Sequence, residues 1–316
     1  MHYNNIASVL FILVWLCSVG ECAVLQTYVN GDYKNSVSDL NCNQYNNDYD
    51  IIRQFPFPLL INPVEYAFNK SAAVMYKNNN ASIQEIYIMD EEIIPASIFC
   101  LSNLEELTII STPFQNGIIP DAIENLKQLQ HLMIYESPIK KITEKLVTLP
   151  KLLTLLLSNC SLTYIQDLSK LKTLEMLELS NNYLTHINDV PALGLLKLDG
   201  NLFKEIPVIK NTDNIWFLDM NKNPLINALP ILSYKNVRYI FLENATLTSI
   251  PPTIDKLQKI EYLLLTDNKI SYLPTNVLNL PNLKEFSIRN NLLSSGDMKL
   301  IETAFKKSHP DLYICV

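Results

Sequence analysis

The chain has 316 residues, of which 48% are apolar, so it is long enough to bury a large hydrophobic core. Its formal net charge is -7, from 25 basic and 32 acidic side chains, and no stretch concentrates Lys and Arg. Because nucleic acids and anionic membranes attract basic surfaces, neither is expected as a partner of this acidic chain.

Residues 1–22 have the pattern of a secretory signal peptide. An apolar run over residues 6–19 precedes Gly20 and Cys22, which would permit cleavage after Cys22, with Gly20 as the other candidate site. The run is shorter than the roughly 20 residues that cross a bilayer. No Lys or Arg precedes it, so a short membrane anchor is the alternative. We expect a secreted, extracellular chain without a stable membrane span after cleavage.

Residues 23–82 follow the leader and show no repeat. They are rich in Asn, Tyr and Asp, and prolines interrupt their apolar pieces, as in residues 55–63. We interpret this segment as an N-terminal cap. A stack of repeats needs such a cap because its first strand would otherwise leave an unpaired edge and an open apolar end.

Residues 83–293 repeat one frame of eleven positions. Apolar residues occupy the first, fourth, sixth and eleventh positions, and the ninth position of the frame is often Asn, as in LEMLELSNNYL at residues 174–184. A spacing of about 22 residues between copies is typical of a solenoid. The ten copies begin at Ile83, Leu104, Leu129, Leu152, Leu174, Leu193, Ile215, Val237, Ile260 and Leu283.

This frame, LxxLxLxxNxL, resembles that of leucine-rich-repeat proteins, and the outer segments resemble a mixture of repeat subtypes of an extracellular kind. The resemblance implies an α/β fold: a right-handed solenoid of about ten repeats, curved like a horseshoe, with a parallel sheet on its concave face. Side chains alternate along a strand, so positions four and six should face the core and positions three and five the concave surface.

The ninth position predicts a buried polar ladder. Its asparagines would satisfy backbone groups where each strand turns away, since an unsatisfied buried group costs about 1 to 3 kcal/mol. Ala245 replaces Asn in one repeat and cannot form such a bond, which predicts a bound water or a loosened turn there. The asparagines are Asn182, Asn201, Asn223, Asn268 and Asn291.

Residues 294–316 follow the last repeat. Met298, Ile301 and Phe305 are spaced for one face of a helix. We therefore expect a helical C-terminal cap.

Four cysteines would remain after cleavage, in a compartment where disulfides persist. Cys160 takes a ninth position and is expected to be a buried, unreactive thiol. A bridge between Cys42 and Cys100 would fasten the N-terminal cap, although spacing alone does not fix the connectivity. Cys315 is the fourth.

Apolar and aromatic side chains gather on the concave face of four consecutive repeats. We expect them to form one exposed patch that binds a protein or peptide partner, because exposed aromatic clusters mark interaction sites. The alternative is that they only pack across neighbouring strands. The patch comprises Leu195, Trp216, Phe217, Tyr239, Phe241, Tyr262 and Leu264.

Carboxylates accompany this patch and are expected to form a solvated acidic rim that favours a basic peptide. A calcium site is the alternative, but the spacing matches no known loop, so no metal is predicted. The rim residues are Glu178, Asp199, Asp219, Glu243 and Asp267.

Four Asn-x-Ser/Thr sequons are candidate glycosylation sites in an exported chain: Asn69, Asn80, Asn159 and Asn244. The last two share the eighth position of their repeats. Glycans there would border the concave face.

The sequence has no nucleophile elbow, phosphate-binding glycine loop or zinc motif. We therefore predict a non-enzymatic, secreted recognition module without cofactors, as the resemblance also implies. One alternative is an extracellular matrix or coat protein that self-associates. Another is an intracellular regulatory scaffold, should the leader not function.

Overall fold

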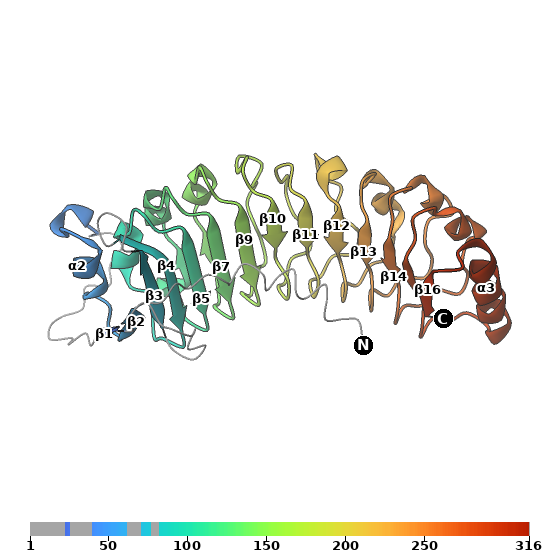
Figure 1. The fold of residues 1–316 in the computed structure, drawn as a ribbon, viewed down its shortest axis with the longest axis horizontal. Helices are drawn as coiled ribbons and strands as arrows, with labels where there is room; N and C mark the ends of the chain where they lie inside the picture. Colours follow the sequence, from blue (N-terminus) through green and yellow to red (C-terminus); the bar gives the residue numbers. More distant parts are fainter. Residues whose placement is uncertain (1–22, 26–39, 62–70, 77–81, 316) are drawn as a thin grey trace.

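The computed structural model describes residues 23–25, 40–61, 71–76 and 82–315, so the predicted leader lies outside the described residues. Within these ranges, one 14-stranded sheet runs the length of the molecule. Its strands follow one another along a curved row, with α2 (Asp48–Ile52) near one end and α3 (Ser295–Ser308) at the other (Figure 1). This confirms the predicted leucine-rich-repeat solenoid.

The ten repeats each supply one strand of the sheet, and all ten are parallel. These strands are β4 (Ser82–Met89), β5 (Glu106–Ile110), β7 (His131–Tyr135), β9 (Thr154–Ser158), β10 (Met176–Glu178), β11 (Leu195–Lys197), β12 (Phe217–Asp219), β13 (Tyr239–Phe241), β14 (Tyr262–Leu264) and β15 (Glu285–Ser287). Three further strands precede them: β1 (Ala23–Leu25), β2 (Leu59–Ile61) and β3 (Ala72–Tyr76), with β3 antiparallel to β4.

The repeats stack position upon position. Leu177 pairs with Leu196, and Leu218 pairs with Ile240, so the fourth-position side chains form one continuous column. In every repeat the first, fourth and sixth positions are buried. The expected alternation is therefore confirmed, and each repeat buries its apolar side chains only by packing on its neighbours.

Short 3-10 helices return the chain on the outer side of most repeats. A 3-10 turn is broader than an extended strand, so a stack of both curves with its strands inside. These helices are η3 (Ala96–Cys100), η4 (Gln115–Gly117), η5 (Asp121–Asn125), η6 (Glu144–Thr148), η7 (Thr212–Asn214), η8 (Leu229–Ser233), η9 (Ile254–Lys256) and η10 (Thr275–Asn279), while η2 (Cys42–Gln44) precedes the repeats. A small second sheet pairs β6 (Ile118–Ile119) with β8 (Lys141–Ile142).

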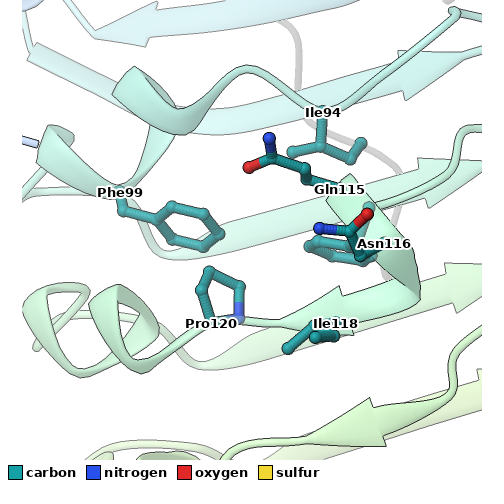
Figure 2. Close-up of a pocket in the computed structure, with 7 residues that line it drawn as sticks. Ile94, Phe99, Gln115, Asn116, Ile118 and Pro120 are labelled. Carbon is teal, nitrogen blue, oxygen red and sulfur yellow. The ribbon is translucent and has the colours of Figure 1, made fainter. Parts of the chain in front are cut away.

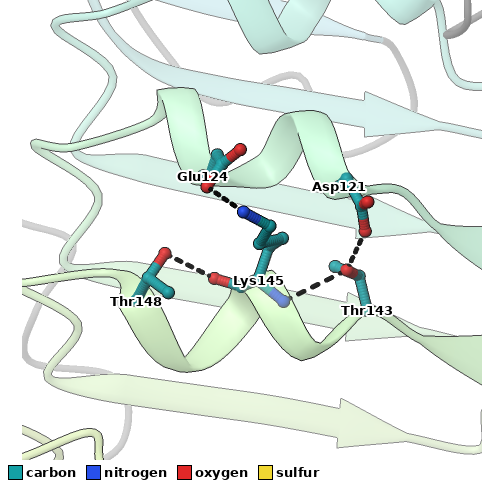
Figure 3. A network of polar contacts seen from close by, with 5 residues as sticks. All are labelled: Asp121, Glu124, Thr143, Lys145 and Thr148. Atoms are coloured by element: carbon teal, nitrogen blue, oxygen red, sulfur yellow. Dashed lines mark hydrogen bonds and ion pairs between the residues drawn. The ribbon is translucent and has the colours of Figure 1, made fainter.

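Polar side chains connect the outer helices η5 and η6 (Figure 3). The ammonium of Lys145 lies 3.0 Å from the Glu124 carboxylate, and the hydroxyl of Thr143 donates to Asp121. Thr148 donates to the carbonyl of Lys145 at 2.8 Å. Both side chains of the ion pair remain partly exposed to solvent, so the pair joins the two helices but adds little to stability.

Each strand leaves the sheet through a left-handed residue at the eighth position. In all ten repeats this residue has φ between 48° and 65°, a region that Asn, Asp and Gly enter most readily. Six of the ten are Asn or Asp, and one is Gly200. The set is Asp90, Ser111, Glu136, Asn159, Asn181, Gly200, Lys222, Asn244, Asp267 and Asn290.

The ninth-position asparagines join consecutive repeats. Oδ1 of Asn182 accepts from the N–H groups of Cys160 and Leu162 at 3.0 and 2.9 Å. Its Nδ2 donates to the carbonyls of Leu157, Leu179 and Ser180. One side-chain amide thus satisfies backbone N–H and C=O groups in the turns of two repeats, which explains why a polar side chain lies within an apolar column.

The prediction of a loosened turn at Ala245 is wrong. The Ala245 N–H donates to Oδ1 of Asn268 at 3.1 Å, and its carbonyl accepts from the N–H of Leu225 at 3.0 Å. The Ala245 carbonyl therefore takes the place of the missing amide oxygen as the acceptor for Leu225. The turn at Cys160, which also lacks the Asn, has the same backbone conformation. Ser161 follows Cys160 and Thr246 follows Ala245, and both have left-handed backbones.

The segment that precedes the repeats is fastened to the first repeat. Cys42 and Cys100 form a disulfide, as the sequence favoured, and the Asp48 carboxylate accepts from the N–H of Ile83 at 2.7 Å. Cys160 is a free, buried thiol, and burial raises its pKa to about 12.

At the other end, α3 packs Phe305 against Phe286, with ring centroids 5.0 Å apart. The segment after α3 then adds β16 (Tyr313–Cys315) as an eleventh parallel strand, which the repeat frame did not predict. The frame failed there because Asp311 stands at the first position, where the other repeats have an apolar residue.

Candidate binding surface on the concave face

The register of the sheet brings the predicted surface residues side by side. At position three, Leu195, Phe217, Tyr239 and Tyr262 are neighbours in that order across β11 to β14. At position five the corresponding order is Lys197, Asp219, Phe241 and Leu264. Residues from separate repeats therefore share one face of the sheet.

Five aromatic side chains on this face contact one another, and we call them the aromatic cluster: Trp216, Phe217, Tyr239, Phe241 and Tyr262. The rings of Tyr239 and Tyr262 stack, with centroids 4.9 Å apart and an interplanar angle of 17°. The ring centroid of Phe217 lies 6.0 Å from that of Trp216, 5.9 Å from that of Tyr239 and 5.1 Å from that of Phe241, and Tyr239 also contacts Trp216 at 5.8 Å. Such contacts stabilise the arrangement beyond simple burial.

The expectation that all seven patch residues are exposed is wrong for three of them. Leu195, Phe217 and Leu264 are only 8%, 7% and 5% exposed, because residues of the adjacent strands cover them. Trp216 is 42% exposed, while Tyr239, Phe241 and Tyr262 are half-buried. Four aromatic rings thus form the accessible surface, and the other three residues support them.

The acidic rim also differs from the expected solvated edge. Glu178 and Asp219 are buried, Asp199 and Glu243 are half-buried, and only Asp267 is exposed. Glu178 accepts from the Ser158 hydroxyl at 2.7 Å and pairs with Lys197 at 3.1 Å. Burial alone would lower the pKa of Lys197, but Glu178 raises it above its ordinary value.

Asp219 is a buried carboxylate beside the aromatic cluster. It accepts from the N–H of Asn221 at 3.0 Å, and it has no ion-pair partner within the part of the chain that the structure describes. Burial raises the pKa of this carboxyl to about 7, with a further contribution from the negative charge of Asp199. It would therefore be partly protonated near neutral pH.

Sequence reasoning overlooked most of the position-two column beside the cluster. Glu261 pairs with Lys284 at 2.6 Å and with Arg238 at 3.6 Å. The same column contains Trp216, which packs over Gly194. The repeat frame alone places Arg238, Glu261 and Lys284 in the same column as Trp216.

Two sequons, at Asn159 and Asn244, lie in exposed turns at one edge of the concave face. The other two, at Asn69 and Asn80, lie outside the described residues. Asn159 and Asn244 both have left-handed backbones, with φ of 55° and 51°.

An apolar pocket lies elsewhere, on the outer segments that follow β4 and β5 (Figure 2). It belongs to the first two repeats, whereas the aromatic cluster spans the seventh to the ninth. Its lining residues are Ile94, Phe99, Phe114, Gln115, Asn116, Ile118 and Pro120.

Over the described ranges, no three His, Cys, Asp or Glu side chains converge as metal ligands would. A search of the same residues for helices with the length and apolarity of a membrane span finds none.

No protein-family profile matches the chain. Osteomodulin from Bos taurus is 31% identical over 101 residues, which cover 32% of this chain and 24% of osteomodulin. The volume-regulated anion channel subunit LRRC8D from Rattus norvegicus is 25% identical over 193 residues, covering 59% of this chain and 21% of the subunit. The chain thus matches no more than about a quarter of the length of either curated relative.

Two solved structures are similar at a TM-score of 0.51. One is the LRR ectodomain of the Arabidopsis thaliana receptor kinase GASSHO1/SCHENGEN3 in complex with CASPARIAN STRIP INTEGRITY FACTOR 2, with 21% identity over 77% of this chain and 32% of the ectodomain. The other is a plant ice-binding protein, with 22% identity over 77% of this chain and 84% of that protein. The repeat and the fold together define a leucine-rich-repeat protein, a class that usually serves in binding without catalysis.

Proposed function

We propose that this chain is a recognition module that holds a protein or peptide partner on its concave face, with the aromatic cluster at the centre of the contact. The observation that carries the proposal is the group of four accessible rings, Trp216, Tyr239, Phe241 and Tyr262, contributed by three consecutive repeats. Tyr and Trp provide large contact areas at low entropic cost and dominate many interfaces.

The contacts of the buried Phe217 ring favour a binding role for the aromatic cluster over a purely structural one. Its buried ring contacts Trp216, Tyr239 and Phe241, and so holds their positions before any partner arrives. A preorganised surface loses less conformational entropy on association. The GASSHO1/SCHENGEN3 ectodomain complex illustrates that this fold binds partners, whereas the ice-binding neighbour illustrates that the fold alone does not select the ligand.

The double variant Tyr239→Ala/Tyr262→Ala tests the proposal. Affinity capture with the wild-type chain identifies a ligand, and titration of the purified ligand then compares the variants. We expect the double variant to weaken binding by tenfold or more, which is about 1.4 kcal/mol. The matched control is Val208→Ala/Ile226→Ala, two exposed apolar residues outside the strands. Equal binding by all three proteins would overturn the proposal.

Self-association through the same rings is the competing function. Sedimentation of the wild type and the tyrosine double variant separates the two. A concentration-dependent oligomer that the variant abolishes would assign the rings to a coat or matrix contact. A monomer at all concentrations supports recognition of a separate partner.

Export is part of the proposal. The Cys42–Cys100 disulfide supports it, because such bonds persist in oxidising compartments, and the leader pattern of residues 1–22 agrees. We expect a eukaryotic secretory route to release the chain without its leader and with glycans on Asn159 and Asn244. Intact mass before and after glycosidase treatment measures both. Retention of the leader in the cell interior would favour the intracellular scaffold instead.

A further inference from the structure

Asp219 and the aromatic cluster meet at one point of the concave face. Asp219 is 8% exposed and lies at position five of β12, directly beside Phe241 of β13. Phe241 in turn meets Phe217 edge to face, at 5.1 Å and 78°. A nearly buried carboxylate therefore adjoins an aromatic surface that is still accessible through Phe241.

Among the described residues, no cation forms an ion pair with that carboxylate, and the charge of nearby Lys197 offsets the effect of its burial only in part. Lys197, the neighbour on β11, pairs with Glu178 on its other side. The remaining charged neighbours are themselves acidic, namely Asp199 and Glu243. A carboxylate removed from water costs free energy unless a partner charge or enough hydrogen bonds replace the lost solvation.

An ammonium or guanidinium group would relieve this cost. The carboxylate supplies a charge-assisted acceptor, and the adjacent ring face attracts a cation through its quadrupole. Asp199 and Glu243 add to the negative potential, and the net charge of -7 would assist the approach of a basic segment.

We infer that the partner is a basic protein segment that places an Arg or Lys side chain between Asp219 and Phe241. This inference rests on the proposed function and names the class of partner for the same surface. The apolar neighbours of that basic residue would lie on Tyr239, Tyr262 and Trp216.

Binding of a cation beside Asp219 should depend on pH. A bound cation favours the ionised carboxylate, so Asp219 releases its proton on binding and affinity rises as pH increases through about 7. The groups that face Asp219 are Lys197 and Asp199 from the β11 repeat and Glu243 from the β13 repeat. Lys197 stays charged over this range because Glu178 raises its pKa.

Selection of random short peptides displayed on phage tests the inference on the full chain with its disulfide intact. We expect enriched peptides to carry Arg or Lys next to aromatic or aliphatic residues. Asp219→Asn keeps an acceptor for the Asn221 N–H, so it should fold, yet it should no longer enrich basic peptides. Asp213→Asn, an exposed carboxylate in η7 just before the repeat that contains Asp219, is the matched control and should select like the wild type.

A double-mutant cycle then tests whether the positive charge of the peptide lies beside Asp219. An enriched arginine peptide and its citrulline counterpart are each titrated against wild type and Asp219→Asn. We expect citrulline to weaken wild-type binding about tenfold or more and to have almost no effect on the variant.

The outcomes separate this inference from the proposed function. Enriched peptides that lack basic residues, or an equal citrulline effect on wild type and Asp219→Asn, would overturn the inference and leave the binding module intact. If no peptide binds the wild type better than it binds Tyr239→Ala/Tyr262→Ala, the proposed function fails and the inference falls with it.

Discussion

The indole of Trp216 packs over the backbone of Gly194, so closely that a Cβ atom on Gly194 would lie 2.5 Å from Nε1 of the indole. Both residues hold position two in adjacent repeats. The missing side chain on one strand thus provides the space for the largest accessible side chain of the aromatic cluster. Gly194 is therefore a positioning residue for the edge of the proposed binding surface.

Gly194→Ala should displace the indole while leaving the solenoid intact. The clash involves a side chain that can rotate away, so the loss of stability should stay below about 1 kcal/mol. We expect Trp216 fluorescence to shift to longer wavelength as the indole becomes more solvated. The measurement uses the chain without residues 1–22, because Trp15 in the predicted leader is the other of the two tryptophans. Gly296→Ala, where a Cβ would make only an ordinary contact with Oγ of Ser294 at 3.7 Å, is the control; an unshifted spectrum for Gly194→Ala would contradict the packing.

Asn268→Ala should destabilise the fold strongly. Its Oδ1 accepts from the N–H groups of Ala245 and Leu247, and its Nδ2 donates to three carbonyls. Loss of these buried bonds should lower the free energy of unfolding by about 3 kcal/mol or more, measured in urea. Asn279→Ala, an exposed residue of η10, should change it by less than about 0.5 kcal/mol. Similar decreases in the free energy of unfolding for both variants would contradict the role given to the buried Asn268 amide.

Asp219 should make the protein less stable as pH rises from about 4 to about 7. The folded state raises the pKa of this carboxyl from 3.8 to about 7, so in this window the folded chain holds a proton that the unfolded chain has released. Stability is therefore highest below the unfolded pKa, falls across the window and levels off above the folded pKa. Asp219→Asn should flatten the profile in urea titrations at several pH values. Parallel profiles for wild type and variant would show that Asp219 does not titrate in this way.

The disulfide between Cys42 and Cys100 should contribute strongly to the stability of the fold. The Cys42–Cys100 bridge spans a separation of 58 residues, so Cys42→Ser/Cys100→Ser should lower the free energy of unfolding by about 4 kcal/mol in the loop-entropy model.

A thiol reagent applied to the native chain should modify Cys315, which is half-buried, well before Cys160, which is buried with a pKa of about 12. Peptide mapping by mass spectrometry reports each site. Early modification of Cys160 would mean that its repeat opens readily.

The sequence by itself determined the solenoid and its register. Leucines at the first, fourth and sixth positions can be buried together in only one way, so the frame fixed which columns face inward and which residues stand side by side, such as Tyr239 and Tyr262. It also identified Cys160 as a buried thiol and favoured Cys42 with Cys100. It missed β16, because Asp311 breaks the pattern, and it misjudged Ala245, because backbone groups can replace a side-chain amide.

Only the tertiary structure decided which members of the outward columns reach solvent. Phe217 and Tyr239 occupy equivalent positions and each contacts three rings, yet Phe217 is only 7% exposed while Tyr239 is half-buried. Likewise Glu178 has a lysine partner and Asp219 has none among the described residues. Exposure and charge compensation depend on distances between side chains of neighbouring repeats, and the spacing of residues along one chain does not contain those distances.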